Sequence, residues 1–169
     1  MNLTDSEVIQ IQDFIARLSP QSDTYLNITG QTPAPIAWTP ALTFATPGDL
    51  TVAYTTQWGA YTKWGNDITL HFVIETSTFT HTTAASNLRV TGIPFASNAD
   101  TTARYIGKLE WGGITKANYT EINCRLAGGS STTMQFVASG SAQAAAFVTA
   151  ADMPSAGTVV LRGTLHYCT

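Results

Sequence analysis

Charge is the first thing that this sequence lacks. Only 11% of its 169 residues are Asp, Glu, Lys or Arg, and the formal net charge is -3. The eight Lys and Arg residues are scattered singly, so the chain offers no basic surface that would neutralise a phosphate backbone. We therefore expect no nucleic-acid partner.

Long apolar runs and cysteines are also scarce. No stretch approaches the roughly 20 apolar residues of a membrane span, and the first residues, "MNLTDSEVIQ", lack the basic and apolar regions of a signal peptide. We expect synthesis in a cytoplasm and no membrane insertion. Cys124 and Cys168 are too few for a disulfide framework, so both are expected to be thiols.

Threonine is abundant instead. The chain has 28 Thr among 169 residues, together with many Val, Ile, Tyr and Phe. β-Branched and aromatic side chains suit half-buried strands. With 44% hydrophobic residues and this length, we expect one globular, mainly all-β domain.

A short amphipathic helix is predicted at the start of the chain. Thr4 and Glu7 have the spacing of a capping box, and Pro20 ends the pattern. Aliphatic residues recur between them at helical spacing: Val8, Ile11, Ile15 and Leu18. A helix of about four turns is marginal by itself in water. Its apolar stripe is therefore expected to pack on its own β domain, on the same helix of neighbouring subunits, or on a separate partner.

The helix is followed by the Pro-rich segment "QTPAPIAWTP", which predicts an extended linker. We therefore divide the chain into an N-terminal helical arm with its linker, residues 1–37, and a β domain, residues 38–169. Turn signals such as "TPGD", "WGND" and "AGGSS" separate short strand-like runs in the second part. The predicted strands are 50–55, 59–64, 67–75, 88–91, 103–111, 119–126, 132–138, 144–149 and 158–167.

Without helical patterns between the strands, the connections should be hairpins and Greek-key crossings. The expected fold is a single antiparallel β-sandwich of jelly-roll-like form. No internal repeat of 20 to 50 residues is present, which argues against a propeller or a repetitive shaft.

The segment "TTQWGAYTKWGND" contains three aromatic residues at equal spacing. On a regular strand Trp58 and Trp64 share one face and Tyr61 lies on the other. If Gly65 and Asn66 form a tight hairpin, we expect Trp64 in the core and Tyr61 outward. For Tyr61 and Trp58, both core packing and ligand contact stay open. The following strand alternates apolar and polar residues, and its expected core face is Ile68, Leu70, Phe72 and Ile74.

Motifs of common enzymes are missing. The sequence has no G-x-S-x-G elbow, P-loop, dinucleotide fingerprint or H-E-x-x-H motif. Glu110 and Glu121 lie on successive predicted strands and are candidates for paired carboxylates in glycoside hydrolysis. Two glutamates on a surface hairpin are far commoner, so we expect no catalytic residues.

Two weaker groupings also favour ordinary structural roles. His166 and Cys168 share a strand face and could join Cys124 as metal ligands, but their spacing is not that of a zinc motif. His71 and Glu75 share a face but are too far apart along the strand for a base and its orienting acid. We expect neither a metal nor a cofactor.

The β region resembles a known class of viral proteins. The run from "TPGDL" through "YTKWG" to "TSTFT", with "GGITKANYT" and "QAAAFVTAADMPSAGTVVLRGTLHY", is similar to β-domains of tailed-bacteriophage virion proteins, especially fibre-like and head-surface proteins. The resemblance covers nearly everything after residue 37. It implies a trimer that binds, braces or adsorbs, made in the cytoplasm of a bacterial host, and it does not imply catalysis.

Our main expectation is a non-enzymatic head decoration or cement protein on the virion surface. The short arm and linker suggest a homotrimer docked on the major capsid protein, which it would stabilise. The helix residues Val8, Ile11, Ile15 and Leu18 would anchor it. The small residues Ala144, Ala145 and Ala146 would form a subunit seam or, equally well, part of an inner strand.

The alternative expectation places the protein on the tail. It would then be a fibre or receptor-binding tip module that recognises host-surface glycans. The candidate glycan contacts are Trp58, Tyr61 and Trp111, since exposed aromatic residues mark recognition surfaces. A polysaccharide-degrading enzyme is a distant third class.

Overall fold

The computed structural model describes residues 34–169, and nearly all of their regular structure is β-strand. The strands are β1 (Ile36–Trp38), β2 (Ala41–Thr46), β3 (Thr51–Trp64), β4 (Asp67–Thr80), β5 (Ala85–Thr91), β6 (Arg104–Gly112), β7 (Glu121–Ala127), β8 (Met134–Ser139), β9 (Ala146–Phe147) and β10 (Val160–Cys168). A single 3-10 turn, η1 (Ala150–Asp152), precedes β10. The described residues contain no helix that is long and apolar enough to cross a membrane.

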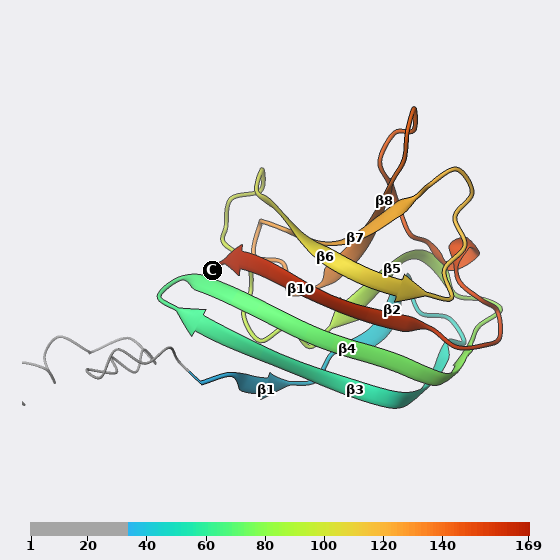
Figure 1. Cartoon of the computed structure of the whole chain (residues 1–169), viewed down its shortest axis with the longest axis horizontal. Helices are drawn as coiled ribbons and strands as arrows, with labels where there is room; N and C mark the ends of the chain where they lie inside the picture. The colour runs from blue at the N-terminus through green and yellow to red at the C-terminus, as the bar shows by residue number, and fades with distance from the viewer. Residues whose placement is uncertain (1–33) are drawn as a thin grey trace, which may run out of the picture.

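The strands form one antiparallel sheet of ten strands in the order β1-β3-β4-β10-β6-β7-β8-β5-β2, with β9 paired to β8. The sheet curls strongly into a half-barrel (Figure 1). The expected all-β antiparallel class is confirmed. The expected division into two sheets is replaced by one continuous sheet, because β6 pairs with β10 on one side and with β7 on the other.

The curl brings the two edge strands, which are consecutive in the chain, to the same side of the molecule (Figure 1). Side chains of β3 connect the edges. The Tyr54 hydroxyl accepts a hydrogen bond of 2.8 Å from the Leu42 backbone N–H, and the Gln57 amide donates one of 2.9 Å to the Pro40 carbonyl. These bonds satisfy backbone groups of the β2 edge that would otherwise lack partners.

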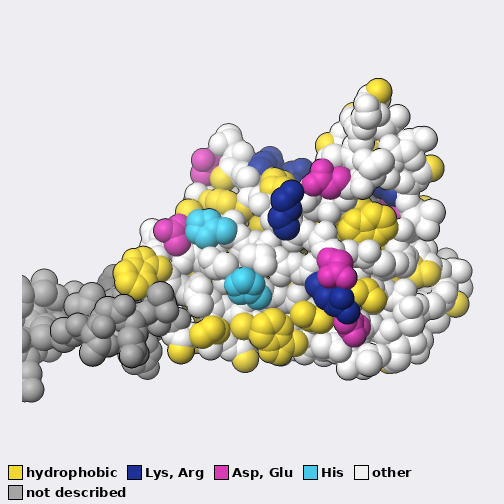
Figure 2. Space-filling model, in the orientation of Figure 1, with side chains coloured by type: hydrophobic (Ala, Val, Ile, Leu, Met, Phe, Trp, Pro, Cys, Tyr) yellow, Lys and Arg dark blue, Asp and Glu magenta, His cyan; other side chains and the backbone are white. Residues whose placement is uncertain are grey.

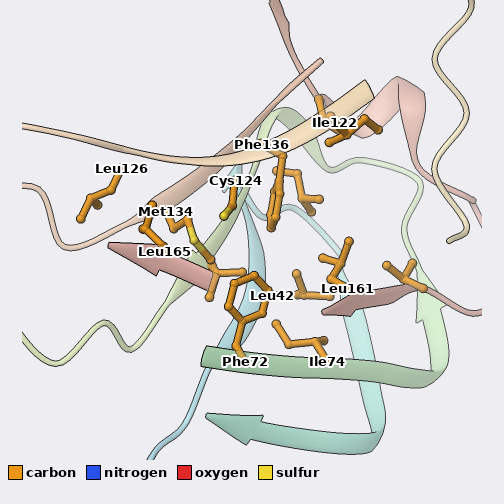
Figure 3. Close-up of a cluster of buried hydrophobic side chains, with 14 of the residues drawn as sticks. Leu42, Phe72, Ile74, Ile122, Cys124, Leu126, Met134, Phe136, Leu161 and Leu165 are labelled. Carbon is orange, nitrogen blue, oxygen red and sulfur yellow. The ribbon is translucent and has the colours of Figure 1, made fainter. Parts of the chain in front are cut away.

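The core lies inside the curl. The predicted apolar face of β4 is confirmed, since Ile68, Leu70, Phe72 and Ile74 are each at most 1% exposed. Figure 3 shows Phe72 and Ile74 of β4 in the cluster that also contains side chains from the opposite wall, among them Cys124, Met134 and Phe136. Alternation of apolar and polar residues on each strand therefore separates an inner from an outer face.

The longest hairpin corrects three sequence-based expectations. Strand β3 is continuous from Thr51 to Trp64 and is not interrupted between the predicted strands 50–55 and 59–64. Trp64 is not in the core but is 68% exposed. Tyr61, expected outside, packs against the core and meets the Phe95 ring edge-on at 5.5 Å between centroids.

The hairpin register explains the placements of Trp64 and Tyr61. The two-residue turn at Gly65 and Asn66 pairs Trp64 with Asp67, and so pairs Tyr61 with Leu70. Directly paired residues lie on the same face of a sheet. Because Leu70 faces the core, Tyr61 must face it too, and Trp64 is on the outer face.

A double irregularity in the same hairpin changes which side chains face inward. A register shift between Ala53 and Tyr54 leaves Ser77 on β4 outside the paired ladder, and a second shift between Tyr54 and Thr56 leaves out Thr55 on β3. On one side of this point Val52 and Tyr54 pack toward the core, whereas Trp58 on the other side is exposed. Bulges of this kind re-aim side chains, and here the change turns Trp58 outward.

Other differences concern the ends and loops. Strands β1 and β2 were not among the predicted strands, and β1 begins at Ile36, just before the expected domain boundary after residue 37. The predicted strand 144–149 is reduced to β9, and Ala144 and Ala145 are exposed in the connection that leads into it. The predicted N-terminal helix lies outside the described residues.

Candidate binding surface

The outer faces of β3, β4, β10 and β6 form a surface of mixed chemistry, called here the outer face. The strand registers arrange its side chains in rows that run across all four strands. One row is Trp58, Val73, Arg162 and Glu110, and the next is Ala60, His71, Thr164 and Lys108. Figure 2 shows hydrophobic, acidic, basic and histidine side chains gathered on this side of the molecule.

Trp58 is at one end of its row and is 50% exposed. It lines a shallow hollow in the outer face together with His71, Val73, Lys108, Glu110, Arg162 and Thr164. Aromatic side chains beside a few convergent polar groups are typical of small-molecule sites. This hollow is therefore the candidate binding site of the described chain.

The sheet beneath Trp58 is held by a second tryptophan. Trp38 on β1 is buried on the inner side, and its indole N–H lies 3.3 Å from the Ala60 carbonyl and 3.2 Å from the His71 carbonyl, to which it donates. A Cβ atom on Gly59 would lie 2.5 Å from the Trp38 indole nitrogen, so only glycine admits the ring there. Trp58, the next residue, thus extends from a fixed backbone.

Arg162 is the electrostatic centre of the outer face. Its Nε and Nη2 donate to Oε1 of Glu75 at 3.1 and 2.5 Å, and its Nη1 donates to Oε1 of Glu110 at 2.9 Å. The Thr56 hydroxyl donates to the other Glu75 oxygen at 3.2 Å. We call these four residues the Arg162 network. A guanidinium that bonds two carboxylates is geometrically fixed.

The network keeps its charges over a wide pH range. Hydrogen bonds from Arg162 lower the pKa of Glu75 below its ordinary value, against a smaller opposing effect of desolvation. The hydrogen bond to Glu75, with the nearby charge of Glu110, raises the pKa of Arg162. A carboxylate with a lowered pKa is a poor general acid. The network is suited to orienting polar groups and not to donating protons.

Further polar groups lie beside the network in the next row. The Nδ1 atom of His71 is 3.1 Å from the Thr164 hydroxyl. Lys108, whose side chain is 90% exposed, approaches Glu121 at 3.6 Å. These side chains add donors and acceptors along one rim of the hollow.

Of the three predicted glycan contacts, only Trp58 is on the outer face. Tyr61 packs inward against Phe95, and Trp111 packs against the core from β6. The three aromatic rings therefore do not form one surface. Sequence alternation already separates Trp58 from Tyr61. The sequence does not show which face of β6 meets the core, so the inward position of Trp111 was not predicted.

The other sequence candidates are also separated. Glu110 bonds Arg162 and Glu121 approaches Lys108, so each of the two glutamates is engaged by a cation of its own. Cys124 is buried, and burial raises the pKa of its thiol to about 12. His166 and Cys168 both approach Asp67 at 3.6 and 3.2 Å on the sheet surface, away from Cys124. Within residues 34–169, no group of three or more such side chains is arranged to hold a metal ion.

The residues expected at capsid or subunit contacts are only partly described. Val8, Ile11, Ile15 and Leu18 lie outside the described residues. Ala144 and Ala145 are exposed in the β8–β9 connection, which projects from the body of the sheet (Figure 1), and Ala146 begins β9. The Tyr119 hydroxyl donates to the Ala144 carbonyl at 3.0 Å and ties this loop to the sheet. A role for these alanines in a subunit seam stays a prediction.

Arg162 was missed by the sequence reasoning, although a signal was present. In "VVLRGTLHY" the polar residues Arg162, Thr164 and His166 alternate with Leu161, Gly163 and Leu165. This pattern places Arg162 on the outer face of a strand. Its pairing with Glu75 and Glu110 depends on β10 lying between β4 and β6, which no local pattern reveals.

Comparison with known proteins gives a likeness of fold. No protein-family model matches the chain, and no curated protein matches it. Among solved structures, the chain is similar to the crystal structure of the Dettilon tailspike protein (gp208), with a TM-score of 0.56 and 13% sequence identity. The match covers 78% of this chain but only 23% of the tailspike chain. The chain thus has the fold of one part of a much longer tailspike polypeptide.

Proposed function

We propose that the chain is a structural module of a bacteriophage tail that contacts the host cell surface. The observation that carries this proposal is the fold shared with part of a tailspike protein. The matched region is a fraction of the tailspike chain, which fits a module that works within a larger assembly. The resemblance of the sequence to virion β-domains supports the same class of protein.

The proposal favours the tail over the head. Our main expectation from the sequence was a trimeric decoration protein on the capsid, with the N-terminal helix as anchor. The tailspike likeness and the exposed Trp58 in a polar hollow give more support to the tail alternative. Assembly as a homotrimer remains part of the proposal, with another virion protein as the attachment partner.

We further propose that the module acts by binding and not by catalysis, without a cofactor. The carboxylates of the Arg162 network support this view, because Glu75 and Glu110 are both bonded to Arg162. A glycosidase needs one carboxyl group with a raised pKa, whereas the pKa of Glu75 is lowered. Loss of a polysaccharide-degrading activity in a Glu110→Gln variant would contradict this part of the proposal.

The experiment that tests the location is electron microscopy of purified virions with a gold label on the C-terminus of the protein. Thr169 is bonded to Asn66 at the end of the β3–β4 hairpin, a site on the periphery of the sheet. We expect label on the tail. Label distributed in a lattice over the head would contradict the proposal and favour the decoration role, and virion heat stability with and without the protein would then measure that role.

A further inference from the structure

We propose that the outer face binds an uncharged saccharide, with one sugar ring stacked on Trp58 and its hydroxyl groups bonded to the Arg162 network. This inference rests on the proposed function and names the class of ligand that the module would recognise. It also defines the site: Trp58 at one end, the Arg162 network in the middle, and the rim formed by His71, Thr164 and Lys108.

The stacking platform is Trp58. Half of its surface is exposed, and its ladder partner on β4 is Val73, so one side of the hollow is apolar. The hydrogen-bearing face of a pyranose ring is also apolar, and burying it against an indole gains free energy without requiring charge. The backbone beneath the ring is fixed by Trp38, so little ordering is required when a ligand binds.

The polar half of the site is oriented before any ligand arrives. Glu110, which is 68% exposed, presents its carboxylate to solvent while Arg162 holds its position. Sugar hydroxyls donate to carboxylates and accept from lysine, and both kinds of group are in adjacent rows here. Four neighbouring strands at about 4.8 Å spacing place Trp58 about 14 Å from Glu110 between Cα atoms, which is long enough for more than one sugar ring.

The pairing of charges favours an uncharged ligand. The charged side chains that line the hollow are Lys108, Glu110 and Arg162. Arg162 bonds Glu75 and Glu110 through Nε, Nη1 and Nη2, and Lys108 approaches Glu121. An acidic sugar would therefore have to compete with these carboxylates for both cations, whereas an uncharged sugar would not.

A saccharide fits the outer face better than a second protein chain does. Stable protein interfaces bury about 800 Å² on each partner and have an apolar centre depleted of charge. The centre of this face is instead the charged Arg162 network, with Trp58 at its end. Self-association through this face would appear as a concentration-dependent mass change that Trp58→Ala abolishes, and this result would overturn the inference.

The test uses the full 169-residue chain on an array of neutral and acidic oligosaccharides that includes lactose and 3′-sialyllactose as a matched pair. Saturation-transfer NMR at millimolar sugar then ranks the glycans that are retained. We expect wild-type protein to retain neutral glycans and to prefer them over their acidic counterparts. Retention of no glycan, or a preference for acidic ones, would overturn the inference.

Matched variants locate the site. Trp58→Ala should weaken binding at least about tenfold, which corresponds to 1.4 kcal/mol, and Trp58→Phe should weaken it less. Trp64→Ala is the control, because Trp64 is on the same strand and the same face but outside the hollow. Arg162→Lys keeps the charge, loses the fork of donors and should also weaken binding. Equal affinity in wild type and Trp58→Ala, or equal loss in the two alanine variants, would contradict the site.

The two proposals can fail separately. Tail labelling without glycan retention would overturn the saccharide site and leave the tail module in place. Glycan retention with head labelling would support the site and overturn the tail location. Because Trp58 is exposed, both of its variants should fold, and amide NMR spectra that overlay with wild type will verify this.

Discussion

The residues on the two faces of strands β3, β4 and β10 are explained by different physical requirements. On the inner face, residues such as Phe72 and Leu161 are almost completely buried, and their identity is explained by packing alone. On the outer face, solubility requires only polar side chains, yet Trp58 is exposed beside an arginine that bonds two glutamates. The inner face therefore determines the fold, and the outer face is where we propose that recognition occurs.

The largest expected effect is on the inner face. Phe72 is 1% exposed, and its ring occupies the space above Gly163, where a Cβ atom would lie 2.6 Å from it. Phe72→Ala should lower the free energy of unfolding by about 3 to 5 kcal/mol through lost burial and a cavity. Urea denaturation measures this change. Val73→Ala on the outer face is the matched control and should cost about 1 kcal/mol; similar losses would contradict the distinction between the faces.

Gly59 follows Trp58 of the outer face in the chain and lies against the buried Trp38 indole. A methyl group added at Gly59 should therefore disturb both faces. Gly59→Ala places a Cβ atom against the Trp38 indole, so we expect a loss of about 1 to 3 kcal/mol from overpacking. Gly112→Ala is the control, because its Cβ would make only an ordinary contact of 3.7 Å with Val160. Thermal unfolding of both variants gives the comparison. Equal melting temperatures would mean that Trp38 is not held as described.

Much of the fold could be predicted from residues whose pattern is local. The alternation of Ile68, Leu70, Phe72 and Ile74 fixed the inner face of β4, and the strands that became β6, β7 and β10 were placed to within about two residues. The hairpin register was also available in principle. A two-residue turn pairs Tyr61 with Leu70, so placing Leu70 in the core requires Tyr61 inside and Trp64 outside.

The remaining features depend on contacts that no local pattern contains. The irregularity at Thr55 and Ser77 reverses the inward-facing positions in the middle of an otherwise regular hairpin. Strand β1 is only three residues long and is recognisable through its pairing with β3. The Arg162 network joins residues from strands far apart in the chain, so Trp58 could be suspected from the sequence while its polar neighbours could not.

The outer face should respond to acid more than the inner face does. The folded-state pKa of Glu75 is lowered by Arg162, so its contribution to stability is present above the ordinary glutamate pKa and is lost as pH falls through the lowered value. Glu75→Gln should therefore lower the urea midpoint at about pH 7, and its difference from wild type should shrink as the pH falls below the ordinary glutamate pKa. A difference that persists at the acidic pH would show that the carboxylate acts through packing and not through charge.

The smallest expected effect is at Trp64. Because 68% of its surface is exposed, Trp64→Ala should change the free energy of unfolding by less than about 0.5 kcal/mol. Urea denaturation of Trp64→Ala and Phe72→Ala in parallel measures the smallest and the largest of the expected losses in free energy of unfolding. A loss above about 2 kcal/mol, four times the expected limit, would place Trp64 in a packed environment.

The most direct test of the outer face is NMR mapping of the full chain with whichever neutral oligosaccharide the array retains. Indole and arginine Nε resonances assigned with the Trp58, Trp64 and Arg162 variants identify the residues that sense the ligand. We predict shifts at the Trp58 indole and the Arg162 Nε, with the Trp64 indole unchanged. Shifts confined to Trp64 or to the projecting residues 140–145 would show that recognition occurs elsewhere and would contradict the assignment.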